Sequence, residues 1–218
     1  MINIMVTLNF SAPPNISSGA QEGTLAQRGF IKARDGWPYI PASAFKGQLR
    51  HAVERAASGM GRTVCTTHRR MCQEWALACP ACRIFGSPWL PGRLHLVDLV
   101  LSGPPELVSR RETSRIYPLH GYRYGVSLNR RRKVAGDQLL YTTELFEPGV
   151  PVAFSGEMVG DLELVDAGWI VAGLNLLAAI GQGKTGGLGW LQATAGVQQE
   201  GVEISAAQLR EALQEVPA

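Results

Sequence analysis

Four cysteines and one histidine lie within a short stretch of this 218-residue chain. Their spacing is Cys65-x2-His68-x3-Cys72-x6-Cys79-x2-Cys82. Thiolate and imidazole groups at such spacings are the ligands of structural zinc sites, where four of them complete a tetrahedron. We favour His68, Cys72, Cys79 and Cys82 as the zinc ligands, with Cys65 as a reserve or as a replacement for His68. Core cysteines without a metal are the alternative.

A second stretch could bind an anion. Residues 181–190, GQGKTGGLGW, hold five glycines around Lys184 and Thr185. Dense glycine lets the backbone turn its N–H groups toward a ligand, and Lys184 adds a positive charge, so phosphate is the natural partner. A nucleotide-binding phosphate loop is excluded, because Ala178 stands where that motif needs glycine and the expected order here is helix then strand. A Gly-rich turn without a ligand is the alternative.

Positive charge is concentrated in one part of the chain, although the net charge is only +3. Eight of the 21 basic residues fall in residues 110–133, where Glu112 is the only acid. Arginine outnumbers lysine by 17 to 4, and its planar guanidinium suits bidentate contacts with phosphate. This pattern favours a nucleic-acid contact over a solvated Arg-rich loop.

Strands and helices with a common core must position these stretches. Apolar alternation and helical spacing predict the following elements: strands over residues 1–11, 29–33, 93–101, 151–159 and 190–195, and helices over residues 41–59, 164–180 and 205–215. Residues 106–120 are expected to be irregular. The order β–α–β–β–α–β predicts an α+β, ferredoxin-like fold in its RNA-recognition variant.

Two further features carry charge on these elements. Lys46 and Arg50 lie one turn apart near the start of the first helix, where cations oppose the helix dipole, so an anionic partner would explain them better than plain exposure. Residues 123–144 predict a long hairpin that projects from the core, because its apolar positions are sparse. With tyrosines along it and a basic tip, such a ribbon can hold a nucleic-acid backbone and wedge between bases.

The composition is that of a soluble globular protein, with 45% hydrophobic and 18% charged residues. No apolar run reaches the length of a membrane span, and the N-terminus lacks the basic start of a signal peptide. We therefore expect a cytoplasmic protein without a membrane partner, in which clustered cysteines bind metal rather than form disulfides. The length allows one domain that carries insertions.

Four motifs occur together in this chain: PYIPASAFKGQLR at residues 38–50, CPACRIFG at 79–86, RYGVSLNR at 123–130, and the Gly-rich stretch at 181–190. In this order they resemble the RAMP superfamily. Among its branches they look most like the repeated backbone subunit of type III CRISPR effector complexes and their relatives, including type VII.

The resemblance implies one RAMP domain over residues 1–218. Its parts would be a palm (1–59, 91–103 and 150–218), a zinc-binding insertion (60–90) and a β-hairpin thumb (104–149). Copies of the chain would assemble as a filament along a CRISPR guide RNA, which pairs with a complementary target RNA beside other effector subunits.

In the family, the first helix and the Gly-rich loop hold guide phosphates, and the thumb interrupts stacking of the guide–target duplex. These roles carry over onto the following RNA-binding residues: Ser43, Lys46, Arg50, Tyr122, Arg123, Arg130, Arg131, Arg132, Lys133, Gly183, Lys184, Thr185 and Gly186.

One departure bears on catalysis. Slicing members of the family place an aspartate in the loop before the PYIP motif, and the matching position here is Ala26 or Gln27. Without that carboxylate no residue is evident that would help to cleave a phosphodiester: Glu22 is the only acid in residues 12–34, and Asp35 lies where relatives have non-catalytic turn residues. We predict a non-slicing backbone subunit, as in type VII relatives, where a separate nuclease cuts the target.

Three alternatives stay open. A slicing ribonuclease of a type III effector would cleave target RNA at six-nucleotide intervals through Glu22 or Asp35. A repeat-processing endonuclease of the superfamily would use His51 or His120 for acid–base chemistry, although those enzymes lack the zinc insertion and this start of the first helix. The third is a zinc-dependent RNA-binding module outside CRISPR.

Overall fold

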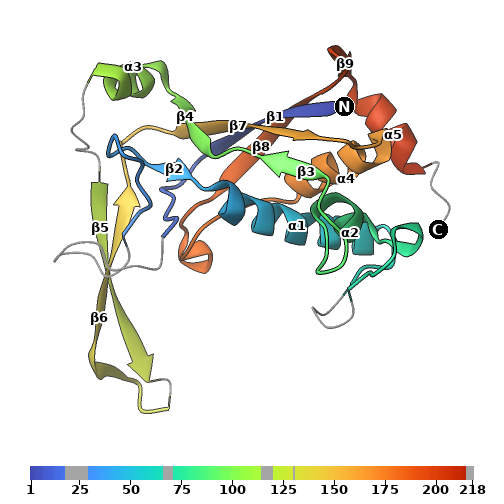
Figure 1. The fold of residues 1–218 in the computed structure, drawn as a ribbon. Helices are drawn as coiled ribbons and strands as arrows, with labels where there is room; N and C mark the ends of the chain where they lie inside the picture. Colours follow the sequence, from blue (N-terminus) through green and yellow to red (C-terminus); the bar gives the residue numbers. More distant parts are fainter. Residues whose placement is uncertain (18–28, 66–70, 114–119, 130, 215–218) are drawn as a thin grey trace.

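The computed structural model describes residues 1–17, 29–65, 71–113, 120–129 and 131–214 (Figure 1). The strands are β1 (Ile2–Phe10), β2 (Tyr39–Ile40), β3 (Leu94–Leu96), β4 (Leu99–Gly103), β5 (His120–Asn129), β6 (Val134–Phe146), β7 (Val152–Gly160), β8 (Leu191–Gln199) and β9 (Val202–Ile204). The helices are α1 (Ala42–Gly59), α2 (Pro80–Phe85), α3 (Pro105–Thr113), α4 (Leu164–Asn175) and α5 (Ala206–Gln214), with single 3₁₀ turns η2 (Trp75–Leu77) and η3 (Lys184–Gly186). This mixture of helices and antiparallel strands confirms the predicted α+β class.

One antiparallel sheet forms the body of the molecule, in the order β2-β4-β7-β1-β8-β9, with β3 also paired to β7. The central strand β1 pairs along its whole length with β7 and with β8. Its alternate residues Ile2, Ile4, Val6 and Leu8 are all 0% exposed, as the predicted apolar alternation requires. Helices α1 and α4 lie side by side beneath this sheet (Figure 1).

Helix α1 confirms the predicted core stripe, since Phe45, Leu49 and Val53 are fully buried. It packs closely on α4, where a Cβ added at Gly173 would lie 2.7 Å from the Val53 side chain. The backbone N–H of Ala42 at its start donates to the Asp98 carboxylate at 2.7 Å. The helix start therefore already has a negative partner inside the protein.

Several boundaries differ from the prediction. The single strand expected over residues 93–101 is split into β3 and β4, because Asp98 turns away to bond the start of α1. Helix α4 ends at Asn175, since the following segment is extended and Ala179 bridges Trp190. Residues 29–33 form only isolated bridges, Ser17 to Phe30 and Lys32 to Pro38.

Residues 105–113 form helix α3 instead of irregular chain. The local signals suit a helix, with Glu106 in the first turn and Arg110 and Arg111 in the last, where each charge complements the helix dipole. Leu107 is buried and fixes this helix to the core. No helix in the described parts of the chain is both long and apolar enough to span a bilayer.

Candidate functional site

The Gly-rich loop, residues 181–190, is fixed at both ends by backbone contacts. The N–H of Gln182 donates to the Asn15 carbonyl at 2.8 Å, and that of Gly189 to the Pro13 carbonyl at 3.0 Å. Gly189 has a φ of +67°, and a Cβ there would lie 2.1 Å from the carbonyl oxygen of Ile180. Only glycine fits at this position, so packing sets the ends of the loop.

The middle of the loop presents backbone donors. In the 3₁₀ turn η3, the N–H of Gly186 donates to the Gly183 carbonyl at 2.8 Å. Within the part of the chain that the structure describes, the N–H groups of Gly183, Lys184 and Thr185 have no hydrogen-bond partner. Three successive donors beside a lysine can bind an anion such as phosphate.

A cleft of about 410 Å³ separates this loop from helix α1. Its polar and aromatic lining comes from both sides: Gln48, His51 and Arg55 on α1, and Lys184, Thr185 and Trp190 around the loop. Lys184 Nζ donates to Gln48 Oε1 at 3.2 Å across the cleft. Trp190 is 49% exposed, so an aromatic face lies beside these cations. The cleft can hold both a phosphate and a stacked base.

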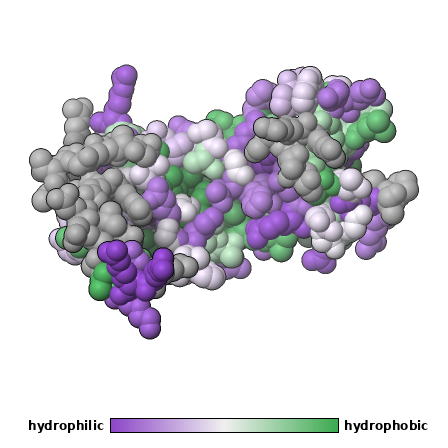
Figure 2. All heavy atoms as spheres, turned by 90° about the horizontal axis from the view of Figure 1, so that it is seen from below, coloured by the Kyte–Doolittle hydropathy of each residue, from purple (hydrophilic) through white to green (hydrophobic). Residues whose placement is uncertain are grey.

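A second cleft, of about 280 Å³, lies on the other side of the loop, against the hairpin of β5 and β6. Arg123 Nη1 donates to the carbonyl oxygen of Gly186 at 2.7 Å and joins the two elements. Tyr124 and Tyr141 also line this cleft. The loop therefore lies between α1 and the hairpin. Seen from below, hydrophilic side chains cover much of the middle of this face and project at the hairpin end (Figure 2).

The hairpin projects from the sheet and is anchored at its base (Figure 1). Glu144 on β6 is 4% exposed; its carboxylate accepts hydrogen bonds from Lys32 Nζ at 2.6 Å and from the Phe30 N–H at 3.1 Å. Apolar side chains are exposed further along: Tyr124, Val126, Leu128 and Leu140 are 72%, 44%, 60% and 62% exposed. A rigid base and exposed apolar strands suit a wedge rather than a core element.

The tip of the hairpin is basic, as predicted. Arg131, Arg132 and Lys133 are exposed, and Asn129 Oδ1 shapes their turn by accepting the N–H groups of both arginines at 3.1 Å. Arg130 lies outside the described residues. The three described cations therefore point to solvent at the end of a projecting ribbon.

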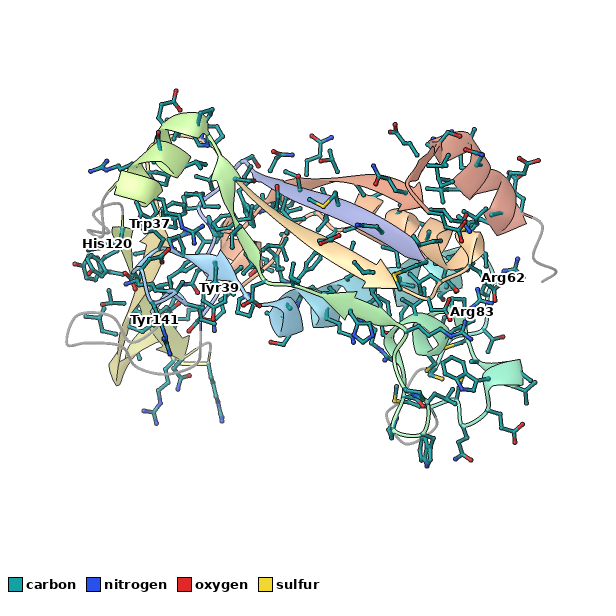
Figure 3. The ribbon with its side chains drawn as sticks, turned by 45° about the horizontal axis from the view of Figure 1, so that its top comes forward. Trp37, Tyr39, Arg62, Arg83, His120 and Tyr141 are labelled. Carbon is teal, nitrogen blue, oxygen red and sulfur yellow. The ribbon has the colours of Figure 1, made fainter. Side chains whose placement is uncertain are left out.

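The aromatic residues of the hairpin base differ in their exposure. Tyr122 is half-buried and packs edge-on against His120, with ring centroids 5.1 Å apart. His120 and Tyr141 lie at the hairpin end of the molecule, whereas Arg62 and Arg83 lie at the opposite end (Figure 3). The ring of His120 is thus placed by the hairpin itself.

The three α1 residues that were predicted to contact phosphate do not lie together on the side of the helix that faces the Gly-rich loop. Ser43 is exposed near the helix start. Lys46 Nζ donates to the Leu94 carbonyl at 3.3 Å, and Arg50 donates to the Gly86 carbonyl at 2.7 Å. Lys46 and Arg50 therefore lie on the side of α1 that faces α2 and β3, away from the cleft of Gln48.

The cysteines form one compact cluster, with all four sulfur atoms within 4.8 Å of one another. Cys65 Sγ lies 3.4 Å from that of Cys72, 3.9 Å from that of Cys79 and 3.8 Å from that of Cys82. A disulfide needs about 2.05 Å, whereas sulfurs at about 2.3 Å from one tetrahedral ion stand about 3.8 Å apart. The cluster fits a metal ion and not a disulfide. It includes the reserve ligand Cys65, and His68 lies outside the described residues.

The surroundings of the cluster affect its thiols unequally. Burial raises the pKa of Cys65 and of Cys79. Burial also opposes ionisation of Cys72, but the hydrogen bond that its sulfur accepts from the Cys79 N–H, with those from the neighbouring thiols, lowers its pKa. Arg50 Nη2 donates to Cys82 Sγ at 3.5 Å. N–H donors and a cation around sulfur stabilise the thiolate form that a metal needs.

Of the two acidic residues considered for RNA cleavage, the structure describes Asp35 but not Glu22. Asp35 Oδ1 accepts the N–H of Trp37 at 3.0 Å, and its Oδ2 pairs with Arg111 at 3.0 Å. Both carboxylate oxygens thus serve a turn and its link to α3. Glu22, Ala26 and Gln27 lie outside the described residues.

Three residues of the α1 cleft were not predicted as contacts for RNA: Gln48, Arg55 and Trp190. His51 was considered only for acid–base chemistry, although it lines the same cleft. The spacing of Gln48, His51 and Arg55 at i, i+3 and i+7 places them on one helix face. That spacing was visible in the sequence, but which face meets the Gly-rich loop was not.

Comparison with known proteins gives the family. No curated protein matches the chain at a significant level. The family model described as the RAMP superfamily matches residues 18–192, a range that includes α1, the cysteine cluster, the hairpin and the Gly-rich loop. Because this match spans well over half of the sequence, the chain belongs to the RAMP superfamily.

Proposed function

We propose that this chain is a guide-RNA-binding backbone subunit of a CRISPR effector complex of type III-like or type VII kind. Membership of the RAMP superfamily, which is associated with CRISPR effectors and RNA binding, supports the class of function. The palm would be a ferredoxin-like domain. Its support is the run β1, α1, β4, β7, α4, β8, whose strands lie in the order β4-β7-β1-β8.

One observation carries the proposal. The three segments to which the resemblance assigns RNA contacts are joined by direct hydrogen bonds, although they are far apart in sequence. Lys184 of the Gly-rich loop bonds Gln48 of α1 at 3.2 Å, and Arg123 of the hairpin bonds Gly186 of the same loop at 2.7 Å. A single strand could therefore cross from the α1 cleft, over the loop, to the hairpin.

These groups would bind RNA without reading its sequence. The free N–H groups of the loop and the charges of Lys184 and Arg55 would hold phosphates. Trp190 and the exposed apolar side chains of the hairpin would contact base faces, which every base offers. Sequence specificity would come from pairing between guide and target, and copies of the chain would repeat the same contacts along the guide.

The cysteine cluster would hold a structural Zn²⁺ ion through Cys65, Cys72, Cys79 and Cys82. The distances of 3.4 to 3.9 Å from the Cys65 sulfur to the other three sulfurs support zinc, and four thiol ligands support a structural role, because they leave no position open for a substrate. Bound zinc would fix the insertion, which includes α2, against α1. His68 remains an alternative fourth ligand.

The subunit would not slice target RNA by itself. The support is that Asp35, the acid nearest the PYIP motif, is engaged on both oxygens by Trp37 and Arg111. A carboxylate in such contacts is poorly placed to bind a catalytic metal or to move a proton. Cutting of the target would then need a separate nuclease subunit.

Expression of the full chain together with a CRISPR repeat–spacer array tests the proposal. The purified protein should carry RNA of one defined length with a common 5′ end, and a labelled complementary target should stay intact in Mg²⁺. RNA of random length would favour a general RNA-binding module. Target cleavage that Asp35→Asn or Glu22→Gln abolishes would identify a slicing subunit instead.

A further inference from the structure

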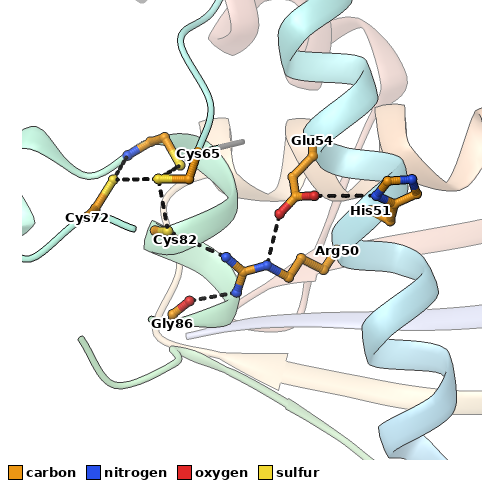
Figure 4. Close-up of polar contacts among 8 residues, drawn as sticks. Arg50, His51, Glu54, Cys65, Cys72, Cys82 and Gly86 are labelled. Atoms are coloured by element: carbon orange, nitrogen blue, oxygen red, sulfur yellow. Dashed lines mark hydrogen bonds and ion pairs between the residues drawn. The ribbon is translucent and has the colours of Figure 1, made fainter. Parts of the chain in front are cut away.

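Arg50 uses every nitrogen atom of its guanidinium inside the protein (Figure 4). Nε donates to Glu54 Oε1 at 3.0 Å, Nη1 to the Gly86 carbonyl at 2.7 Å, and Nη2 to Cys82 Sγ at 3.5 Å. The side chain is 22% exposed. These contacts use three of the five N–H donors of the guanidinium and fix its orientation.

Two of the three contacts of Arg50 lie at the cysteine cluster and at its supporting helix α2. Cys82 is buried on α2, and Gly86 ends that helix with a φ of +88°. A Cβ at Gly86 would lie 2.7 Å from the Gly92 nitrogen, so the chain that receives the Arg50 hydrogen bond is tightly held. Arg50 thus connects α1 to a rigid part of the cluster.

The charge of the metal-bound cluster gives a chemical reason for the contact between Arg50 and Cys82. Four thiolates around a divalent ion carry a net charge of −2, which is costly in a partly buried site without a nearby cation. Among the described residues, Arg50 is the cation whose hydrogen bond to a cluster sulfur the structure records. An N–H donor to a thiolate also lowers the electron density on sulfur and tunes its bond to the metal.

We infer that Arg50 is a positioning residue of the metal cluster, which holds Cys82 in its ligating arrangement and offsets the cluster charge, and is not a contact for guide phosphate. The inference depends on the metal site proposed above. It assigns the two arginines of α1 to different tasks, with Arg50 serving the cluster and Arg55 serving the RNA cleft.

Zinc affinity of the purified full chain tests this role by competition with a chromophoric chelator. Arg50→Ala should weaken zinc binding by about 10-fold to 100-fold, the range seen when such supporting contacts are removed. Arg55→Ala is the matched control on the same helix and should leave zinc affinity unchanged. In Co²⁺-loaded protein, Arg50→Ala should also shift the sulfur-to-cobalt charge-transfer bands to lower energy, because Cys82 loses a hydrogen bond.

RNA binding separates the two roles. With zinc in excess, Arg50→Ala should keep the salt dependence of RNA binding, whereas Arg55→Ala should flatten it. Arg50→Lys keeps the positive charge but cannot make the three hydrogen bonds to Glu54, Gly86 and Cys82 together, so zinc should bind at least about threefold more weakly. This variant decides the matter if Arg50→Ala does not fold.

Zinc content, zinc affinity and the salt dependence of RNA binding distinguish the ways in which the inference could fail. Wild-type protein without bound zinc would refute the metal site itself. Zinc-loaded wild type with unchanged affinity in Arg50→Ala, or in Arg50→Lys where only that variant folds, would overturn the role of Arg50. A flattened salt dependence in Arg50→Ala with unchanged zinc affinity would return Arg50 to the RNA contacts.

Discussion

Alanine substitution of Lys184 and Arg55 measures how many phosphates the α1 cleft holds. The two cations come from opposite walls of this cleft, Lys184 from the Gly-rich loop and Arg55 from α1. Each substitution removes one positive charge from the path that we propose for the guide RNA. Neither lies near the cysteine cluster, so the effects on RNA and on metal stay separate.

The magnitude follows from counterion release. A single-stranded RNA releases about 0.7 counterion for each phosphate that a cation neutralises, so each substitution should flatten the slope of log K against log salt by about 0.7. The double variant should lose about 1.4 from the slope. When the salt falls from about 1 M to about 0.1 M, the RNA affinity of the wild type should therefore rise about fivefold more than that of a single variant and about 25-fold more than that of the double variant.

Fluorescence anisotropy with labelled single-stranded RNAs of two unrelated sequences provides the assay. Arg210→Ala on α5 removes an exposed charge remote from the cleft and should leave the slope unchanged. Thermal unfolding shows whether loss of the Arg55 hydrogen bond to the Leu176 carbonyl matters for folding. An unchanged slope in the double variant, or a loss confined to one RNA sequence, would refute phosphate binding in this cleft.

Two further substitutions address the metal and the loop. Cys79→Ser should release zinc and expose the insertion to protease, because one of four sulfurs is lost; unchanged zinc content by elemental analysis would exclude Cys79 as a ligand. Gly189→Ala should lower the free energy of unfolding by more than about 2 kcal/mol, since a left-handed φ adds to a clash with Ile180. Gly187→Ala, with a φ of +85° but open space, should lose only about 1 kcal/mol in urea unfolding, and equal losses would contradict this reading of the loop.

Local sequence patterns predicted the central elements well, because those elements depend on short-range periodicity. The alternation in residues 1–11 gave β1, and the stripe of Phe45, Leu49 and Val53 gave α1. Helix α3 was not predicted, because Leu107 and Val108 are the only large apolar residues among its nine and show no helical periodicity. The split between β3 and β4 depends on a hydrogen bond from Ala42 to Asp98, which joins residues 56 positions apart and leaves no local signal.

The site was harder to predict for the same reason. Residue types indicated Lys184 and the cysteines, since dense glycine and paired cysteines are chemical signatures in themselves. Which face of α1 meets which partner depends on the packing of α1 against α2, α4 and the Gly-rich loop. The sequence therefore suggested Lys46 and Arg50 as one phosphate site, whereas their hydrogen bonds lie with β3 and α2.

Helical rotation explains why neighbouring arginines on α1 have different partners. Five residues turn an α-helix by about 140° beyond one full turn, so Arg50 and Arg55 point to different sides. Glu54 lies between these two sides: its Oε1 accepts a hydrogen bond from Arg50 Nε at 3.0 Å, and its Oε2 lies 3.5 Å from Nδ1 of His51, which lines the α1 cleft (Figure 4). The carboxylate contacts Arg50 on the side of the cysteines and His51 on the side of the cleft, so α1 connects the side that we propose to be supported by metal with the side that we propose to bind anions. A substitution on this helix should therefore affect zinc or RNA according to the side on which it lies.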